Sequence, residues 1–256
     1  MNDSLSIASS DSPLPYRLDL AGGWLDQPFV SRLHPGAVIT LSIAPSHDFD
    51  PRGGMGARTR ESAVELWDGA LPASADYHKL AKILFRYDNP PGKLTISGSQ
   101  DAIGIVYPGL ARAHYAGDYW TDQVDHITDE AIISFLEGAI TLIPLGARRD
   151  GYDPLADRTV TRDTVRALAD ASEGAWTAIL ARDLAAFGAA ARESFEAQIA
   201  MFPYMVSDAV AGTIARYRDQ ASGWKVSGAG GGGYLILVTD RAIDGGLKVT
   251  VRRAVS

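Results

Sequence analysis

The sequence predicts an α+β fold built in two layers, and three observations support this. Strand-like segments stand early in the chain, helices follow in blocks, and two more strand-like segments close it. Separate groups of strands and helices are typical of α+β proteins. A length of 256 residues suits one large domain or two modest domains that share a cleft. A change of character near Ile127 predicts a division into residues 1–127 and 128–256.

In the first half, the elements follow from alternation and helical spacing. We expect a frayed polar tail as far as Pro15 and then a strand over 16–21, where polar and apolar residues alternate. A second strand is expected over 37–43, and the polar segment 45–56 predicts a loop. Helices are expected over 59–67 and 76–87, the second ended by the breakers at 89–92.

In the second half, short strand-like segments are expected over 111–115 and 119–126. Asp129 is a helix-capping residue, so a helix is expected to begin there. A strand over 140–145 precedes a mobile loop over 146–157. Alanine-rich helices then cover 161–181, 183–200 and 207–221, and strands over 234–238 and 247–252 close the chain.

Composition limits the classes of function. The net charge of −7 argues against a nucleic-acid partner, because phosphate backbones need clustered Lys and Arg. The absence of cysteine excludes disulfides, thiolate metal sites and a cysteine nucleophile, and it is compatible with the cytoplasm, where we expect the protein. We expect no membrane partner, because no apolar run is long enough to span a bilayer and residues 1–15 do not resemble a signal peptide.

Glycine-rich loops are the strongest functional signal. Five of the six residues from 228 to 233 are glycine and a strand follows, so backbone N–H groups there can approach an anion or a neighbouring loop. A tight turn explains this loop equally well. Near the other end, Gly22 and Gly23 bring Asp26 to a loop tip, where its carboxylate suits the hydroxyls of a polyol. The alternative for Asp26 is a solvated turn residue.

Two further loops offer chemistry. Gly53, Gly54 and Gly56 stand immediately before a helix, which makes an anion site; Thr59 or Ser62 is suited to a phosphate-bound Mg²⁺, and Arg58 or Arg60 to phosphate oxygens. The alternative is a flexible loop with solvated arginines. Asp101 follows Gly98 among apolar residues and is suited to activate a hydroxyl or orient a cation, although helix capping explains it too. The scattered histidines argue against a zinc site, and without a Gly-x-Ser-x-Gly motif the sequence gives no argument for a hydrolase triad.

In this order the loops resemble the motifs of the GHMP small-molecule kinases, the superfamily of galactokinase, homoserine kinase, mevalonate kinase and phosphomevalonate kinase. The heptose and fucose kinase branch is the most similar, here in a shortened form. Its opening Arg-x-x-x-Ala-Gly-Gly-x-x-Asp element is matched from Arg17 to Asp26, and its Gly-x-Gly-Ser-Ser-Ser-Ala phosphate loop is matched loosely from Gly54 to Ala63. Its Gly-x-Gln-Asp element is matched by 98–101, and its closing Lys-x-Ser-Gly-Ala-Gly-Gly-Gly-Gly by 225–233.

The resemblance implies an N-terminal domain like ribosomal protein S5, a ferredoxin-like C-terminal domain, and ATP, Mg²⁺ and a sugar between them. Asp101 would receive the proton of the attacking hydroxyl or orient that hydroxyl, and Arg17 would be a second catalytic residue. The substrate would contact Asp26, Gly22, Gly23, Trp24, Gly230 and Gly231. The nucleotide would contact Gly54, Gly56, Ala57, Arg58, Thr59, Arg60 and Ser62, and the metal would contact Thr59 and Asp88.

The function expected from the resemblance is an ATP-dependent kinase of a sugar hydroxyl. An alternative is a binding or regulatory module of the same fold that holds a sugar phosphate, with a nucleotidyltransferase as a possible partner. Only about ten residues separate the strand over 37–43 from Gly53, where the family places several strands and an adenine-binding loop, and this favours the alternative. A third, weaker alternative is an enzyme of this fold with another reaction, such as a decarboxylase.

Overall fold

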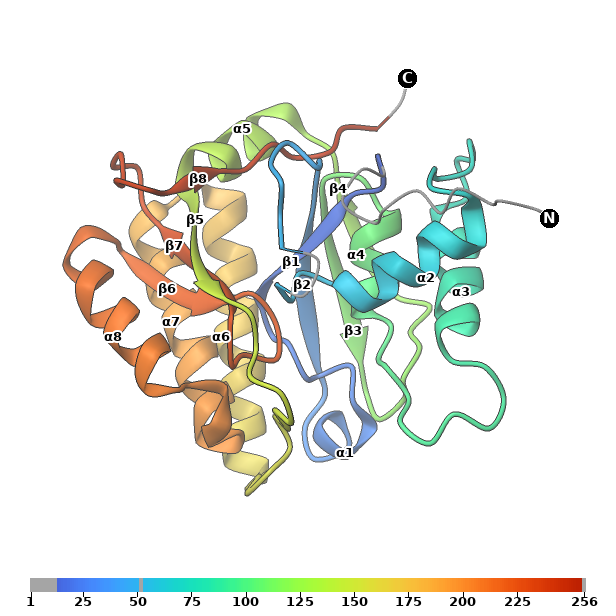
Figure 1. Cartoon of the computed structure of the whole chain (residues 1–256), viewed down its shortest axis with the longest axis horizontal. Coiled ribbons are helices and arrows are strands. Elements are labelled where there is room, and N and C mark those ends of the chain that lie inside the picture. The colour runs from blue at the N-terminus through green and yellow to red at the C-terminus, as the bar shows by residue number, and fades with distance from the viewer. Residues whose placement is uncertain (1–12, 51–52, 255–256) are drawn as a thin grey trace.

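The computed structural model describes residues 13–50 and 53–254, which form two antiparallel sheets with helices packed around them (Figure 1). The strands of the first sheet pair in chain order. They are β1 (Tyr16–Ala21), β2 (Gly36–Ile43), β3 (Leu110–Tyr115) and β4 (Val124–Ile127). The helices in this half of the chain are α1 (Pro28–Ser31), α2 (Ala57–Trp67), α3 (Tyr77–Asp88) and α4 (Gln100–Val106).

The second sheet has the strand order β6-β7-β5-β8. Its strands are β5 (Ile140–Gly146), β6 (Gly223–Val226), β7 (Gly233–Val238) and β8 (Leu247–Lys248). The helices in this half are α5 (Glu130–Ala139), α6 (Arg162–Ala181), α7 (Leu184–Met201) and α8 (Asp208–Tyr217), with 3₁₀ turns at Pro203–Met205 and Arg218–Gln220. No helix in the described part of the chain combines the length and apolarity that a bilayer span requires.

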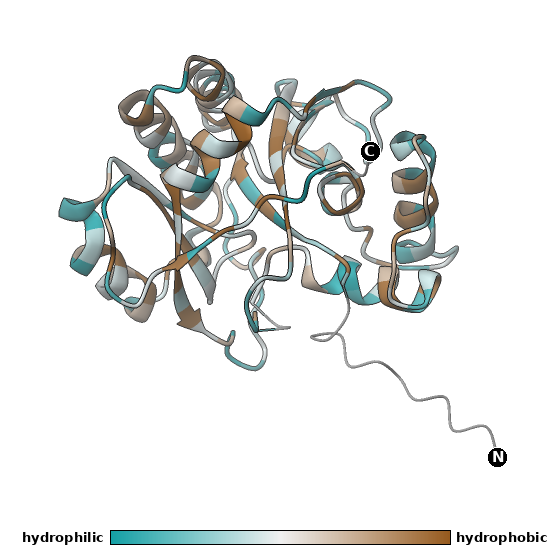
Figure 2. Ribbon diagram, turned by 90° about the horizontal axis from the view of Figure 1, so that it is seen from above, coloured by the Kyte–Doolittle hydropathy of each residue, from teal (hydrophilic) through white to brown (hydrophobic). Residues whose placement is uncertain are grey.

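Local sequence explains where the helices of the second half begin. The side chains of Asp129, Thr161, Asp183 and Ser207 accept backbone N–H bonds from the first turns of α5, α6, α7 and α8. Thr161 and Thr164 also form a reciprocal capping box. Apolar residues gather on the strands and on the helix faces that meet them (Figure 2). Burial of these faces, rather than propensity alone, therefore holds the helices in place.

The two sheets are joined by helices that pack between them and by a common hydrophobic core. Helix α6 packs on β2, and α7 packs on both β1 and β6. One continuous core joins Leu25 and Val38 of the first half to Leu168 and Phe195 of the second. The strands of the two sheets lie on either side of Ile127, as the expected boundary requires, but the division into two domains stays a prediction.

Several boundaries differ from those expected. Leu14 and Pro15 are buried rather than frayed, because the Leu14 carbonyl accepts a hydrogen bond from Arg60. Pro13 before them is exposed. Residues 1–12 of the expected tail lie outside the described residues. The strand expected over 119–126 is reduced to β4, and that over 247–252 to β8. Strand β6 and helix α1 were not expected. Both are four residues long, too short to carry a periodic signal.

Candidate active site

An ion pair between Arg17 and Asp101 connects the first strand to helix α4. The side chain of Arg17 is 5% exposed and that of Asp101 is 25% exposed. The backbone N–H of Arg17 donates to the Met55 carbonyl at 3.0 Å, so β1 also carries the expected phosphate loop. The remaining guanidinium nitrogens of Arg17, Nε and Nη1, have no hydrogen-bond partner within the described residues. Arg17 therefore has donors to spare for a further acceptor.

Asp26 is a buried carboxyl group beneath the turn that leads into α4. Its Oδ1 accepts a bond from Gln100 Nε2 at 3.0 Å, and a Cβ on Gly98 would meet its Oδ2 at 1.8 Å. Burial, and then the charge of Asp101, raise the pKa of Asp26 from 3.8 to about 7, against the opposing effect of Arg17. Asp26 is 2% exposed, so it supports the turn that holds Asp101. Its contact with sugar hydroxyls stays a prediction.

The turn of Gly22, Gly23 and Trp24 is fixed by α7. Ser194 Oγ accepts from the N–H of Gly22 at 3.0 Å, and Gln198 Nε2 donates to the Gly23 carbonyl at 3.0 Å. A side chain on Gly22, whose φ is +79°, would strike the Ala37 carbonyl. The Trp24 ring stacks on Phe202 with centroids 4.4 Å apart. These residues pack against protein, and their contacts with substrate stay predictions.

The expected phosphate loop meets the closing glycine loop. Gly54 and Gly56 both have left-handed backbone, and Gly56 is the N-cap of α2 with no side-chain cap bond. The N–H of Met55 donates to the Ser227 carbonyl at 3.1 Å, and a Cβ on Gly233 would lie 2.2 Å from the Gly53 carbonyl. The first turn of α2, which begins at Ala57, contains no acidic residue. The positive end of the α2 dipole is therefore uncompensated by an acidic side chain of that turn.

The structure corrects the expected phosphate contact of Arg60. Its guanidinium lies over the Tyr16 ring, 4.2 Å from the centroid, and its Nε donates to the Leu14 carbonyl at 3.1 Å. At 2% exposure it is out of reach of a phosphate in this arrangement. Arg58 is exposed in the first turn of α2, and its contact with phosphate stays a prediction.

The expected metal ligands meet one another but do not fit a metal. Thr59 Oγ1 and Ser62 Oγ donate to the two carboxylate oxygens of Asp88, each at 3.0 Å. Lys93 Nζ lies 3.8 Å from Asp88 Oδ1 and balances its charge. Within the described residues there is no group of three His, Asp or Glu side chains placed to hold a metal ion. Asp88 already has its donors and its cation, so Thr59 and Asp88 are engaged with protein groups rather than placed for Mg²⁺.

The closing glycine loop is filled by side chains that the sequence did not single out. A Cβ on Gly230 would strike Met205, and one on Gly231 would strike the Tyr152 ring. Arg148 Nε donates to the Gly230 carbonyl at 2.8 Å, and Tyr152 Oη donates to the Ala229 carbonyl at 2.6 Å. The segment expected as a mobile loop is thus tied to the glycines. The substrate contacts of Gly230 and Gly231 stay predictions.

A buried ion pair completes the connection between the two sheets. Lys225 Nζ on β6 lies 2.9 Å from Asp19 Oδ2 and donates to the Asp19 carbonyl at 2.6 Å. Both side chains are at most 2% exposed. Burial lowers the pKa of the Lys225 ammonium from its usual 10.5, and the charge of Asp19 opposes this. All four motifs found in the sequence are therefore joined by bonds between β1, the loop before α2, α4, and β6 with the residue that follows it.

Several solved structures align with this one over most of its length. A D-glycero-D-manno-heptose 1-phosphate kinase from Bacteroides thetaiotaomicron superposes with a TM-score of 0.63 at 14% identity, covering 94% of this chain and 95% of that one. The mevalonate kinase of L. major, solved with R-mevalonate, gives 0.62 at 12% identity over 96% and 97%. A putative sugar kinase from Campylobacter jejuni gives 0.58 at 15% identity over 89% and 86%.

The chain has the GHMP kinase fold. The α+β prediction and the resemblance drawn from the loops are thereby confirmed at the level of the fold. No protein-family model matches the chain, and no curated protein sequence matches it significantly.

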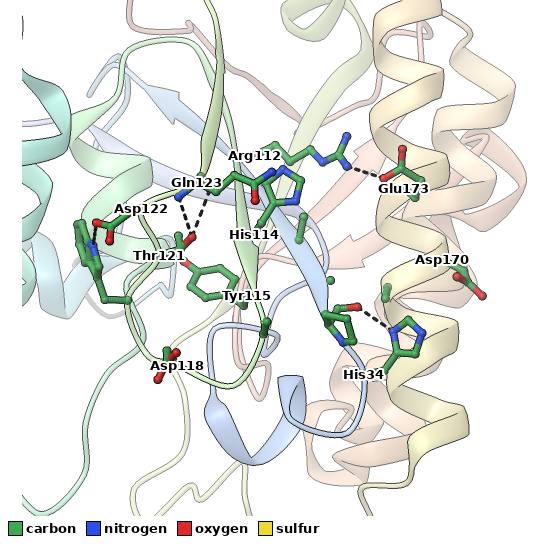
Figure 3. Close-up of a pocket in the computed structure, with 16 residues that line it drawn as sticks. His34, Arg112, His114, Tyr115, Asp118, Thr121, Asp122, Gln123, Asp170 and Glu173 are labelled. Atoms are coloured by element: carbon green, nitrogen blue, oxygen red, sulfur yellow. Dashed lines mark hydrogen bonds and ion pairs between the residues drawn. The ribbon is translucent and has the colours of Figure 1, made fainter.

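A groove of about 910 Å³ lies on another part of this GHMP kinase fold (Figure 3). It is lined by the start of β2, by β3 and the loop after it, and by α6, and it contains none of the expected site residues. Two of its basic side chains already have carboxylate partners: Arg112 Nη2 lies 2.6 Å from Glu173 Oε2, and His114 Nε2 lies 2.8 Å from Oδ2 of Asp125, outside the groove lining. We place the candidate site at the Arg17–Asp101 pair because the motifs meet there.

Proposed function

We propose that this protein is an ATP-dependent kinase that phosphorylates a hydroxyl group of a sugar or sugar derivative. The observation that carries the proposal is the Arg17–Asp101 ion pair, which lies where the N-terminus of α2 and the glycine loop after β6 meet. Phosphoryl transfer asks the protein mainly to position two reactants and to neutralise charge. A carboxylate paired with a buried arginine, next to backbone amides and a helix dipole, supplies both.

Asp101 serves as the proton acceptor in this reaction. Arg17 holds the carboxylate of Asp101 in place, while the partly exposed face of Asp101 receives the acceptor hydroxyl. The hydroxyl oxygen forms a bond to the terminal phosphorus of ATP, the bond from that phosphorus to the bridging oxygen of ADP breaks, and the hydroxyl proton passes to Asp101. The guanidinium of Arg17, whose buried Nε and Nη1 have no partner within the described residues, adds positive charge beneath the place of the phosphoryl oxygens.

The test is release of ADP from Mg·ATP over a panel of hexoses, heptoses, their phosphates and mevalonate. The wild type is compared with Asp101→Asn and with Asp244→Asn, a control at an exposed aspartate. We expect turnover with at least one sugar acceptor, reduced about 10²- to 10⁴-fold by Asp101→Asn alone. The proposal is refuted if none of the acceptors supports turnover, or if the two variants turn over at the same rate. A preference for mevalonate refutes only the sugar substrate.

A second candidate is a module of this fold that binds a sugar phosphate without transferring phosphate. Burial of Arg60 and Thr59 favours it, because two of the expected nucleotide contacts are turned into the protein. Calorimetry separates the two candidates: binding of a hexose phosphate together with no binding of ATP would favour the module.

A further inference from the structure

Arg148 is a cation held at the meeting point of the two glycine loops. It follows β5 in the chain, and its Nε donates to the Gly230 carbonyl at 2.8 Å. The guanidinium carbon lies 5.6 Å from the centroid of the Tyr152 ring, whose hydroxyl donates to the Ala229 carbonyl. Two side chains of one segment are therefore bonded to consecutive carbonyls of the glycine loop. This fixes where the rest of the guanidinium points.

The free end of Arg148 points toward the expected phosphate loop. Its Nη2 lies 3.6 Å from the position that a Cβ on Gly54 would occupy. The charges of Asp101 and Arg17 both act on Arg148, which places the three side chains in one electrostatic neighbourhood. On the other side of the loop, Arg17 Nε lies 3.7 Å from the equivalent position on Gly56. The two arginines thus flank the turn Gly54–Gly56 at the start of α2.

Two guanidinium groups, those of Arg17 and Arg148, lie near the Asp101 carboxylate, and the other nearby carboxyl group, Asp26, is buried with its pKa raised to about 7. Arg148 makes no ion pair with a carboxylate of the described residues, whereas Asp101 is already paired with Arg17. Arg17 retains two buried nitrogens that lack a partner among those residues. The N-terminus of α2 adds its dipole, with no acidic side chain in the first turn. Arg148 is therefore a half-buried cation with no carboxylate partner among the described residues, at a place where an anion would neutralise its charge.

We propose that Arg148, together with Arg17 and the N-terminus of α2, forms a subsite for a phosphoryl group. The planar guanidinium suits phosphate oxygens because it offers paired donors in a fixed geometry. This proposal rests on the proposed function and deepens it, since Arg148 supplies the charge that the buried Arg60 does not. The phosphoryl group is either the terminal phosphate of the nucleotide or a phosphate already on the acceptor.

Calorimetry on the full chain tests this with inorganic pyrophosphate, Mg·AMP-PNP and mannose 6-phosphate. The variants are Arg148→Gln and, as a matched control, Arg149→Gln at the exposed neighbouring residue. We expect Arg148→Gln to weaken pyrophosphate binding about 10- to 100-fold, as loss of charge-assisted bonds does, and Arg149→Gln to change it less than about twofold. If Arg148→Gln also binds Mg·AMP-PNP more weakly but mannose 6-phosphate unchanged, the subsite belongs to the nucleotide. If it binds mannose 6-phosphate more weakly but Mg·AMP-PNP unchanged, the subsite belongs to the acceptor.

Equal binding by the two variants overturns the subsite. If Arg148→Gln does not fold, Arg148→Lys and Arg149→Lys replace the pair: binding several-fold weaker in Arg148→Lys supports the subsite, and equal binding overturns it. The outcome is separable from that of the kinase assay. Absence of turnover with a clear loss of binding in Arg148→Gln refutes the kinase and keeps the subsite, whereas turnover with unchanged binding refutes the subsite alone.

Discussion

Replacing Asp26 by asparagine is expected to change how stability depends on pH. In the folded protein the pKa of Asp26 is raised from 3.8 to about 7, mainly by burial. Between these two pH values the folded state holds a proton that the unfolded state has released. This group therefore contributes stability that is fully present below pH 3.8 and is lost as the pH rises through about 7.

The magnitude follows from the same two pKa values. Each pKa unit corresponds to about 1.4 kcal/mol, so the whole shift corresponds to about 4 kcal/mol, of which about 3 kcal/mol is lost between pH 5 and pH 8.5. Asparagine resembles the neutral acid and keeps an acceptor for Gln100. The free energy of unfolding of Asp26→Asn, relative to that of the wild type, is therefore expected to rise by about 3 kcal/mol over this range.

Urea unfolding followed by the fluorescence of the five tryptophans measures this difference. The control is Asp244→Asn at an exposed aspartate, which removes one surface carboxylate and leaves the site intact. If the curves for Asp26→Asn and the wild type run parallel from pH 5 to pH 8.5, Asp26 is ionised in the folded state. The reasoning about burial beneath Gly98 is then wrong.

Three further predictions concern the connections around the site. Lys225→Met should lower the free energy of unfolding in urea by about 3–5 kcal/mol, because it leaves the carboxylate of Asp19 buried and unpaired. The double variant with Asp19→Leu should recover part of this loss, and losses that simply add would contradict the reasoning. Asp88→Ala should lower stability by about 2–3 kcal/mol yet leave the Mg²⁺ dependence of turnover unchanged, and a large shift in that dependence would restore Asp88 as a metal ligand. Gly233→Ala should lower the thermal unfolding midpoint more than Gly151→Ala does. Both glycines have positive φ, but of the two only Gly233 faces a carbonyl, that of Gly53. Equal losses would show that the backbone conformation alone sets the cost.

Features that depend on local patterns could be predicted from the sequence. Strand β1 was expected at its observed bounds, because alternation and the following glycines are both local signals. The helices of the second half were expected within a few residues, since Thr161, Asp183 and Ser207 each mark a helix start. The meeting of the glycine motifs was predicted from a family resemblance rather than from the residues themselves.

Features that depend on distant contacts could not be predicted. Nothing around Arg60 shows that its side chain turns to Leu14 and Tyr16 rather than to a phosphate. Arg148 stands in a loop with no periodicity, and its partner Gly230 lies 82 residues further along the chain. Strand β6 exists because it pairs with β7, which its own four residues do not indicate.

The bonds around the site run from β1 to β6 and back to β1, so residues of both sheets hold the site in position. The N–H of Arg17 binds the Met55 carbonyl, the N–H of Met55 binds the Ser227 carbonyl, and Ser227 follows β6 directly. Lys225 on β6 returns to Asp19, two residues beyond Arg17 on β1. Successive side chains of a strand alternate between faces, so Arg17 and Asp19 lie on the same face of β1. A displacement of the glycine loop must therefore move Arg17, and with it the carboxylate of Asp101, so residues remote from the reacting atoms are expected to control their alignment.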